Sequence, residues 1–286
     1  MELPRRASAA SAEWPALAPT IIYLYMLALL TVRSFAALAA AEPPTLCRLL
    51  LVRHGQTDFN ADGRLQGRLE SQLTAEGHAQ TTRLGEWMAT TESGSVDRVY
   101  VSPRKRTLQT LANVESKHTT LPPAEQRFGL REIELTMWEG QYKADVRDSN
   151  GNPDTARWAR WKQDPDTFNF EEDGHSPFGD VKRRAAEEWA FLLSATPPST
   201  TSLVVAHGAF NRVLMLTALG LPVDGRGFRD DQFAFENAAT VELQWRAGAS
   251  HASAWRKRYP SESEWITREQ ELERVAAAAQ QDKLEL

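Results

Sequence analysis

This sequence of 286 residues contains one cysteine and no excess of positive charge. The single cysteine, Cys47, has no second thiol with which to form an intramolecular disulfide or a cysteine-based metal site. No cluster of histidines or carboxylates has metal-ligand spacing either, so neither a metal nor another cofactor is expected. The net charge of −5 lacks the basic character typical of nucleic-acid binders, so nucleic acid is not an expected partner.

Long apolar runs are absent except near the N-terminus, where positions 20–32 read "TIIYLYMLALLTV". In a signal peptide, Arg5 and Arg6 would supply the positive charge, residues 21–32 the apolar region and "ALAAAE" the cleavage site. As a membrane anchor, residues 21–41 could associate with a bilayer, although Arg33 interrupts them. A transit peptide, an upstream extension of the gene model and a buried helix are further interpretations. We assign residues 1–45 to a targeting sequence or membrane anchor, and secretory, membrane-anchored and organellar locations stay open.

The rest of the chain alternates strand-like and helix-like patterns. Apolar runs of strand length lie at 47–53, 96–102, 201–207 and 238–245, and helical spacing lies at 73–89, 104–114 and 208–220. Ser102 and Pro103 fit the cap and first turn of the helix at 104–114. This alternation predicts an α/β domain over residues 46–250, with helices on both faces of a mostly parallel sheet. Residues 251–286 are expected to form a helical or disordered tail.

Two of these strands end in histidine followed by glycine. "LVRHGQTDFN" begins at Leu51, and its strand ends with Arg53 and His54. "LVVAHGAF" ends its strand with His207 before a helix. Ligands bind at the carboxyl ends of strands in such sheets, and the N–H groups of a helix start attract anions. A third strand leads to Ser102 and a basic run that includes Arg106. We therefore expect an anion site at this sheet edge.

Five motifs in this order resemble the histidine phosphatase superfamily, in the branch of phosphoglycerate mutases and fructose-2,6-bisphosphatases. They are "LVRHGQTDFN", "LQGRLESQLTAEGHAQ", "VSPRKRTLQT", "LREIELTMWEG" and "LVVAHGAFNRVL", within residues 47–245. The resemblance implies a phosphoglycerate mutase-like fold, in which a mostly parallel sheet lies between two helical layers.

The resemblance also implies a role for individual residues. His54 would attack phosphorus to form a phosphohistidine, and Glu132 would protonate the leaving oxygen, with Glu134 and Glu139 as nearby alternatives. Arg104 competes with Arg106 for one arginine role, and the motif spacing favours Arg106. The phosphoryl oxygens would be held by Arg53, Arg106, His207 and Asn60, with Gln56, Thr57, Gly67 and Gly208 as further binding residues.

Phosphoryl transfer independently requires groups of these kinds. A phosphomonoester carries close to two negative charges, so a neutral imidazole needs fixed cationic donors around the phosphoryl oxygens. The basic leaving oxygen needs a proton donor, and the same carboxylate can then activate water. This set needs no metal.

The motif around Glu132 favours hydrolysis of a small phosphorylated metabolite, such as a sugar phosphate or phospho-acid. Mutase-type phosphoryl transfer, a membrane-tethered phosphoprotein phosphatase and an inactive scaffold are the alternatives. The chain departs from the family pattern at Thr136, where glycine is usual, and at His175, where glutamate is common. Residues 141–180, which are rich in aromatic side chains, are the expected specificity region, although such aromatics more often belong to the core.

Overall fold

A computed structural model describes residues 45–91 and 96–284, and the predicted targeting segment 1–45 lies outside this range except for Thr45. In the described part, strands β1 (Leu46–Arg53), β2 (Arg98–Val101), β3 (Ala124–Gln126), β4 (Thr201–Ala206), β5 (Thr240–Arg246), β6 (Ala254–Tyr259) and β7 (Ile266–Thr267) form one sheet. Their order is β3-β2-β4-β1-β5-β6-β7. Strands β3, β2, β4 and β1 are parallel, whereas β5, β6 and β7 continue the sheet antiparallel.

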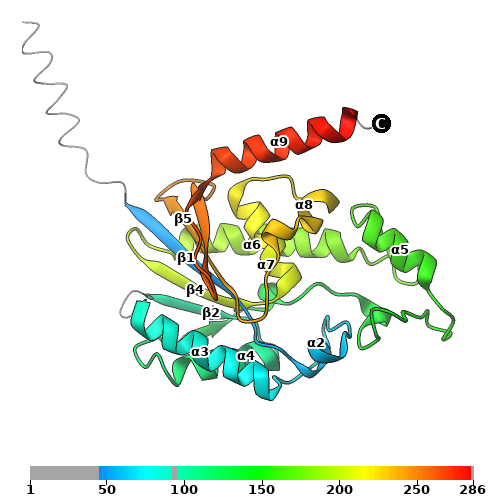
Figure 1. Ribbon diagram of the computed structural model, residues 1–286, viewed down its shortest axis with the longest axis horizontal. Coiled ribbons are helices and arrows are strands. Elements are labelled where there is room, and N and C mark those ends of the chain that lie inside the picture. The colour runs from blue at the N-terminus through cyan, green and yellow to red at the C-terminus, as the bar shows by residue number, and fades with distance from the viewer. Residues whose placement is uncertain (1–44, 92–95, 285–286) are drawn as a thin grey trace, which may run out of the picture. The chain divides into compact units, whose positions relative to one another are not determined.

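Helices cover both faces of this sheet (Figure 1). Helices α3 (Ala75–Thr91) and α4 (Lys105–Glu115) pack on one face, and α6 (Pro177–Ala195) and α7 (Gly208–Leu219) on the other. The remaining helices are α2 (Asp58–Asp62), α5 (Thr155–Gln163), α8 (Gly225–Arg229) and α9 (Arg268–Leu284). The predicted α/β fold with a helical layer on each side is therefore confirmed.

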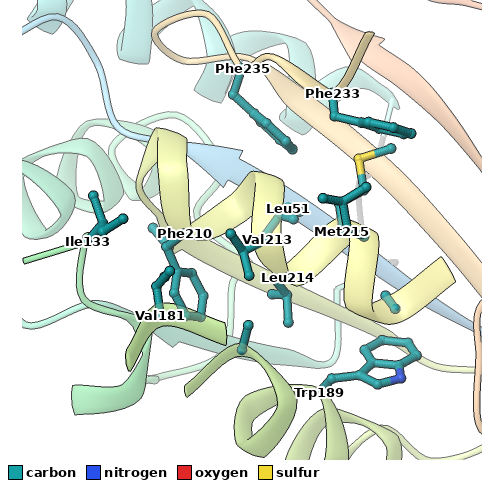
Figure 2. Close-up of a cluster of buried hydrophobic side chains, with 14 of the residues drawn as sticks. Leu51, Ile133, Val181, Trp189, Phe210, Val213, Leu214, Met215, Phe233 and Phe235 are labelled. Carbon is teal, nitrogen blue, oxygen red and sulfur yellow. The ribbon is translucent and has the colours of Figure 1, made fainter. Parts of the chain in front are cut away.

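Strand β1 shows why its apolar run is unbroken. Successive side chains of a strand point to opposite faces, so a strand covered on both sides buries all of them. Leu49 and Leu51 join the core beneath α6 and α7, while Leu50 and Val52 join the core beneath α3 and α4. Figure 2 shows Leu51 close to the aromatic and aliphatic side chains of α7.

The structure differs from the sequence-based expectation at three places. Helix α4 begins at Lys105 with Arg104 as its N-cap, so the predicted cap at Ser102 is wrong. Glu70 instead accepts a hydrogen bond from the Lys105 N–H, and thus replaces the missing cap. Residues 251–286 were expected to be a helical or disordered tail, but they contain strand β6. This strand belongs to the sheet because it pairs with β5. Helix α6 had no counterpart among the predicted helices.

No helix among the described residues has the length and apolar character needed to cross a membrane.

Candidate active site

The parallel pairing of β1 with β4 brings the two predicted histidines together. Arg53 lies opposite Ala206 at the ends of these strands, so His54 and His207 leave the sheet side by side. Their ring centroids are 5.3 Å apart. Gly55 follows His54 where helix α3 comes close, since a Cβ there would lie 2.6 Å from the Gly77 carbonyl. The glycine therefore makes room for helix α3.

His54 is buried and held in one orientation. Its Nδ1 lies 2.7 Å from the carbonyl oxygen of Gly55. A carbonyl can only accept, so Nδ1 carries the proton and Nε2 keeps its lone pair. Burial, followed by the charges of Arg106 and Arg53, places the pKa of His54 well below its usual range. The ring is therefore a neutral imidazole at physiological pH.

Arg106 and His207 form a buried pair behind His54. The Arg106 Nε donates to His207 Nδ1 at 3.2 Å, and its terminal nitrogens donate to the carbonyls of Leu69 and Gly67. Because Nδ1 accepts this bond, Nε2 of His207 carries the proton and donates to Ser102 Oγ at 2.8 Å. Burial lowers the pKa of Arg106 to about 10 and, together with the Arg106 charge, puts that of His207 well below its usual range. Arg106 thus remains a cation beside two neutral imidazoles.

The Arg53 side chain has a buried donor that is not used within the described residues. Its Nη1 donates to the Phe235 carbonyl at 2.6 Å, whereas its buried Nε has no hydrogen-bond partner within the described ranges. A Cβ at Gly208 would lie 3.2 Å from that Nε, so glycine lets α7 begin against the guanidinium group. Burial lowers the pKa of Arg53 despite the opposing effect of Glu132. An anion here would provide the missing acceptor.

Glu132 lies at the N-terminus of α7. Its carboxylate accepts hydrogen bonds from the backbone N–H groups of Ala209 at 3.3 Å and Phe210 at 3.0 Å. The alternatives lie elsewhere: Glu134 pairs with Arg131, and Glu139 accepts from Arg68. Of these three glutamates, only Glu132 lines the cavity described next.

A cavity of about 280 Å³ opens beside His54. Its wall contains predicted site residues, namely Arg53, His54, Asn60, Gly67, Glu132 and Gly208. The sequence reasoning missed three further cations of this wall, Arg64, Lys143 and Arg212. Arg212 follows Gly208 by four residues in α7, which is the one local signal that could have identified it. Predicted residues that do not line the cavity are Arg106, His207, Gln56 and Thr57.

The residues after His54 build a short helix. The Thr57 hydroxyl caps α2 by accepting from the Asn60 N–H at 3.1 Å. The Asn60 Oδ1 accepts from Thr57 N and from Asn237, which leaves the Nδ2 amino group of Asn60 as the donor for a ligand. Gln56 accepts a hydrogen bond from the Thr74 hydroxyl. Gln56 and Thr57 therefore support the loop that carries Asn60.

Other predicted alternatives lie outside the cavity wall. Arg104 forms an ion pair with Glu70, whereas Arg106 is buried and donates to His207. His175 Nε2 contacts the Glu134 carbonyl, and its ring stacks on Phe170. In the expected specificity region 141–180, Lys143 reaches the cavity wall. Aromatic residues of this region pack in the core, notably Trp161, Phe168 and Phe170.

Comparison with known proteins places this geometry in a family. A family model for the histidine phosphatase superfamily (branch 1) matches residues 49–258. The chain is 34% identical over 178 residues to a probable 2-carboxy-D-arabinitol-1-phosphatase of Arabidopsis thaliana, covering 62% of this chain and 34% of the relative. It therefore spans about a third of that plant protein. It is also 26% identical over 213 residues to a probable phosphoglycerate mutase, GpmB, of Klebsiella pneumoniae, covering 73% of this chain and 90% of the relative.

A solved structure shows the same fold. The mycobacterial glucosyl-3-phosphoglycerate phosphatase superposes with a TM-score of 0.59 and 26% identity, covering 74% of this chain and 97% of the other. The family model covers more than half of the chain, including both histidine motifs. This chain therefore belongs to the histidine phosphatase superfamily, which confirms the resemblance seen in its motifs.

Proposed function

We propose that this chain is a phosphatase that hydrolyses a small phosphorylated metabolite, such as a sugar phosphate or phospho-acid, through a phosphohistidine on His54 and without a metal. One observation carries the proposal: a buried, neutral His54 keeps its Nε2 lone pair beside Arg53 and Arg106. A strand-end histidine with only a structural role would not need two buried cations next to it.

In the first step, His54 Nε2 forms a bond to phosphorus while the bond from phosphorus to the leaving oxygen breaks. Protonated Glu132 gives its proton to that oxygen, so the product leaves as a neutral alcohol. The His54 ring gains positive charge, which the hydrogen bond from Nδ1 to the Gly55 carbonyl stabilises. Arg53 and Asn60 bind the phosphoryl oxygens, and direct contact by Arg106 and His207 remains a prediction.

In the second step, the Glu132 carboxylate takes a proton from water. The water oxygen bonds to phosphorus as the bond to His54 Nε2 breaks, and this releases phosphate and restores both side chains. The N–H groups at the start of α7 orient Glu132 for both steps. Glutamine at position 132 would keep a hydrogen-bonding oxygen but could not transfer the proton.

The names of the relatives support hydrolysis without deciding it. The plant and mycobacterial relatives are named as phosphatases, and the bacterial relative as a probable mutase. Mutase-type transfer therefore remains the second candidate. The alternative of a membrane-tethered phosphoprotein phosphatase depends on residues 1–45, which lie outside the described residues apart from Thr45.

The test compares the full chain with His54→Ala on p-nitrophenyl phosphate and a panel of phosphate esters. We expect phosphate release by the wild type, acid-labile labelling of the protein from radioactive substrate, and loss of both in His54→Ala. His78→Ala is the matched control, because His78 is exposed. Release that persists in a well-folded His54→Ala variant would refute the mechanism. Faster isomerisation of phosphoglycerate than hydrolysis, stimulated by a bisphosphoglycerate primer, would favour the mutase.

A further inference from the structure

The cavity wall carries more positive charge than the proposed chemistry uses. Besides Arg53, the side chains of Arg64, Lys143 and Arg212 line it, and Glu132 is the only acidic residue of that wall. The chain as a whole has a net charge of −5, so this local excess runs against its overall composition.

The two additional arginines have neutral partners. Arg64 Nε donates to the Gly140 carbonyl at 2.6 Å, and its guanidinium group lies 4.0 Å from the Phe59 ring centroid. Arg212 donates to backbone carbonyls of Phe233 and Phe228. Burial lowers the pKa of Arg212, although the more distant Asp231 and Asp230 oppose this. These acceptors carry no charge, so they leave the positive charge of both arginines in place.

Arginines elsewhere in the described chain behave differently. Arg127, Arg157 and Arg184 each lie within 4 Å of a carboxylate. Within the described ranges, no such ion pair involves the three cavity cations. Keeping the charges of the partly buried Arg64 and Arg212 without a counter-ion is unfavourable, and a bound anion would offset this.

A phosphoryl group alone does not account for these cations. It carries close to two negative charges near neutral pH. Arg53 and Arg106 already place two positive charges beside His54. We infer that the substrate carries a second anionic group, a carboxylate or another phosphate, that Arg64, Lys143 and Arg212 bind. This inference rests on the proposed function and narrows its substrate to acidic phosphomonoesters.

The experiment compares 3-phosphoglycerate with glycerol 3-phosphate, which has a hydroxymethyl group in place of the carboxylate. The kcat/KM of each compound is measured. Its inhibition constant for p-nitrophenyl phosphate hydrolysis is measured as well, because this constant reports binding even when the compound is hydrolysed slowly. We expect the acid to be preferred at least about tenfold, as for one charge-assisted hydrogen bond. Fructose 1,6-bisphosphate against fructose 6-phosphate distinguishes a second phosphate from a carboxylate.

Lys143→Met and Arg64→Gln test the assignment to these residues. Lys143 is exposed, so its substitution leaves the core untouched. Each variant should lower the preference for the acidic partner about tenfold. Lys182→Met is the matched control, because Lys182 pairs with Asp166 and lies outside the cavity wall; its preference should equal that of the wild type.

Equal values for the acidic and neutral partners in the wild type would overturn the inference, as would variants that retain the full preference. Neither result affects His54-dependent hydrolysis of p-nitrophenyl phosphate, which reports on the proposed function alone. If that hydrolysis is absent, a binding titration of the same ligand pairs still decides whether the second anion site exists.

Discussion

Thr136 has a backbone conformation that suits glycine. Its φ is +41°, and its buried hydroxyl has no hydrogen-bond partner in the described part of the chain. A residue other than glycine in the left-handed region destabilises the folded state by about 1–3 kcal/mol. Glycine would remove this cost, but its greater conformational entropy in the unfolded chain would cancel about 0.5–1 kcal/mol of the improvement. Thr136→Gly should therefore raise the free energy of unfolding by about 1 kcal/mol. Urea denaturation measures it. Thr136→Ala is the comparison, because it removes the hydroxyl and the γ-methyl group but keeps the Cβ atom that disfavours a positive φ. A glycine variant no more stable than the alanine variant would contradict the prediction.

The two buried histidines predict loss of stability in mild acid. Burial and the charge of Arg106 lower the pKa of both His54 and His207. Below about pH 6.5 the unfolded chain binds protons at these positions and the folded chain does not. Stability should therefore decline as the pH falls from about 6.5 toward 5, by about 1 kcal/mol per pH unit for each histidine. Urea denaturation at pH 7.5, 6 and 5 measures this slope, and His54→Gln should reduce it by about half. An equal slope in that variant would contradict the assignment.

At the scale of elements, helix α6 holds the segment that carries Glu132. The buried Arg184 donates to the carbonyls of Gly129 at 2.9 Å, Arg131 at 2.7 Å and Glu132 at 3.1 Å. Asp180, one turn earlier, fixes the guanidinium group at 2.7 Å. A helix that the sequence patterns did not predict therefore positions the proposed proton donor.

Arg184→Lys should impair proton donation more than substrate binding, because an ammonium group cannot reproduce the planar set of donors. We expect kcat/KM to fall about 10- to 100-fold for an alkyl phosphate. It should change less than about threefold for 2,4-dinitrophenyl phosphate, whose leaving group needs little protonation. Arg183→Lys, on the exposed side of α6, is the control. Equal losses for both substrates would show that Arg184 contributes only to folding.

At the scale of the whole molecule, Glu242 joins segments that are distant in sequence. Its buried carboxylate on β5 binds Arg48 of β1 and Arg256 and Arg258 of β6. Burial pushes the pKa of Glu242 upward, but the hydrogen bonds and charges of Arg48 and Arg258 outweigh it, so the pKa is lowered. The contribution of Glu242 to the free energy of unfolding is therefore fully present above the pKa that this carboxyl group has in the unfolded chain. It is lost as the pH falls through the lower pKa that the group has in the folded chain.

Glu242→Gln should lower the free energy of unfolding by about 3 kcal/mol at pH 7, because it removes the buried negative charge shared by the buried Arg258 and the half-buried Arg48 and Arg256. Urea denaturation measures the loss, and the difference from the wild type should shrink below about pH 4. Glu187→Gln removes an exposed pair with Arg183 and should change stability by less than about 1 kcal/mol. Similar effects of the two substitutions would contradict the proposed importance of the Glu242 cluster.

The sequence alone identified the elements that local patterns encode. The strand at 201–207 was predicted because an apolar run buried on both faces is visible without its neighbours. Helix α7 was predicted to end at Gly220, whose φ of +62° forms the left-handed cap that glycine favours. The motif around His54 indicated the superfamily, since the order of residues at strand ends is a property of the chain itself.

Tertiary structure alone decided which distant side chains meet. The antiparallel pairing of β5 with β1, the contacts of Arg184 with the Glu132 segment and the convergence of Arg64, Lys143 and Arg212 all join residues far apart in the chain. Such contacts depend on packing between elements, and a single sequence carries no periodic or local signal for them. The family of the chain could therefore be anticipated from the motif around His54, whereas the charge of the cavity around that histidine could be seen only in the folded chain.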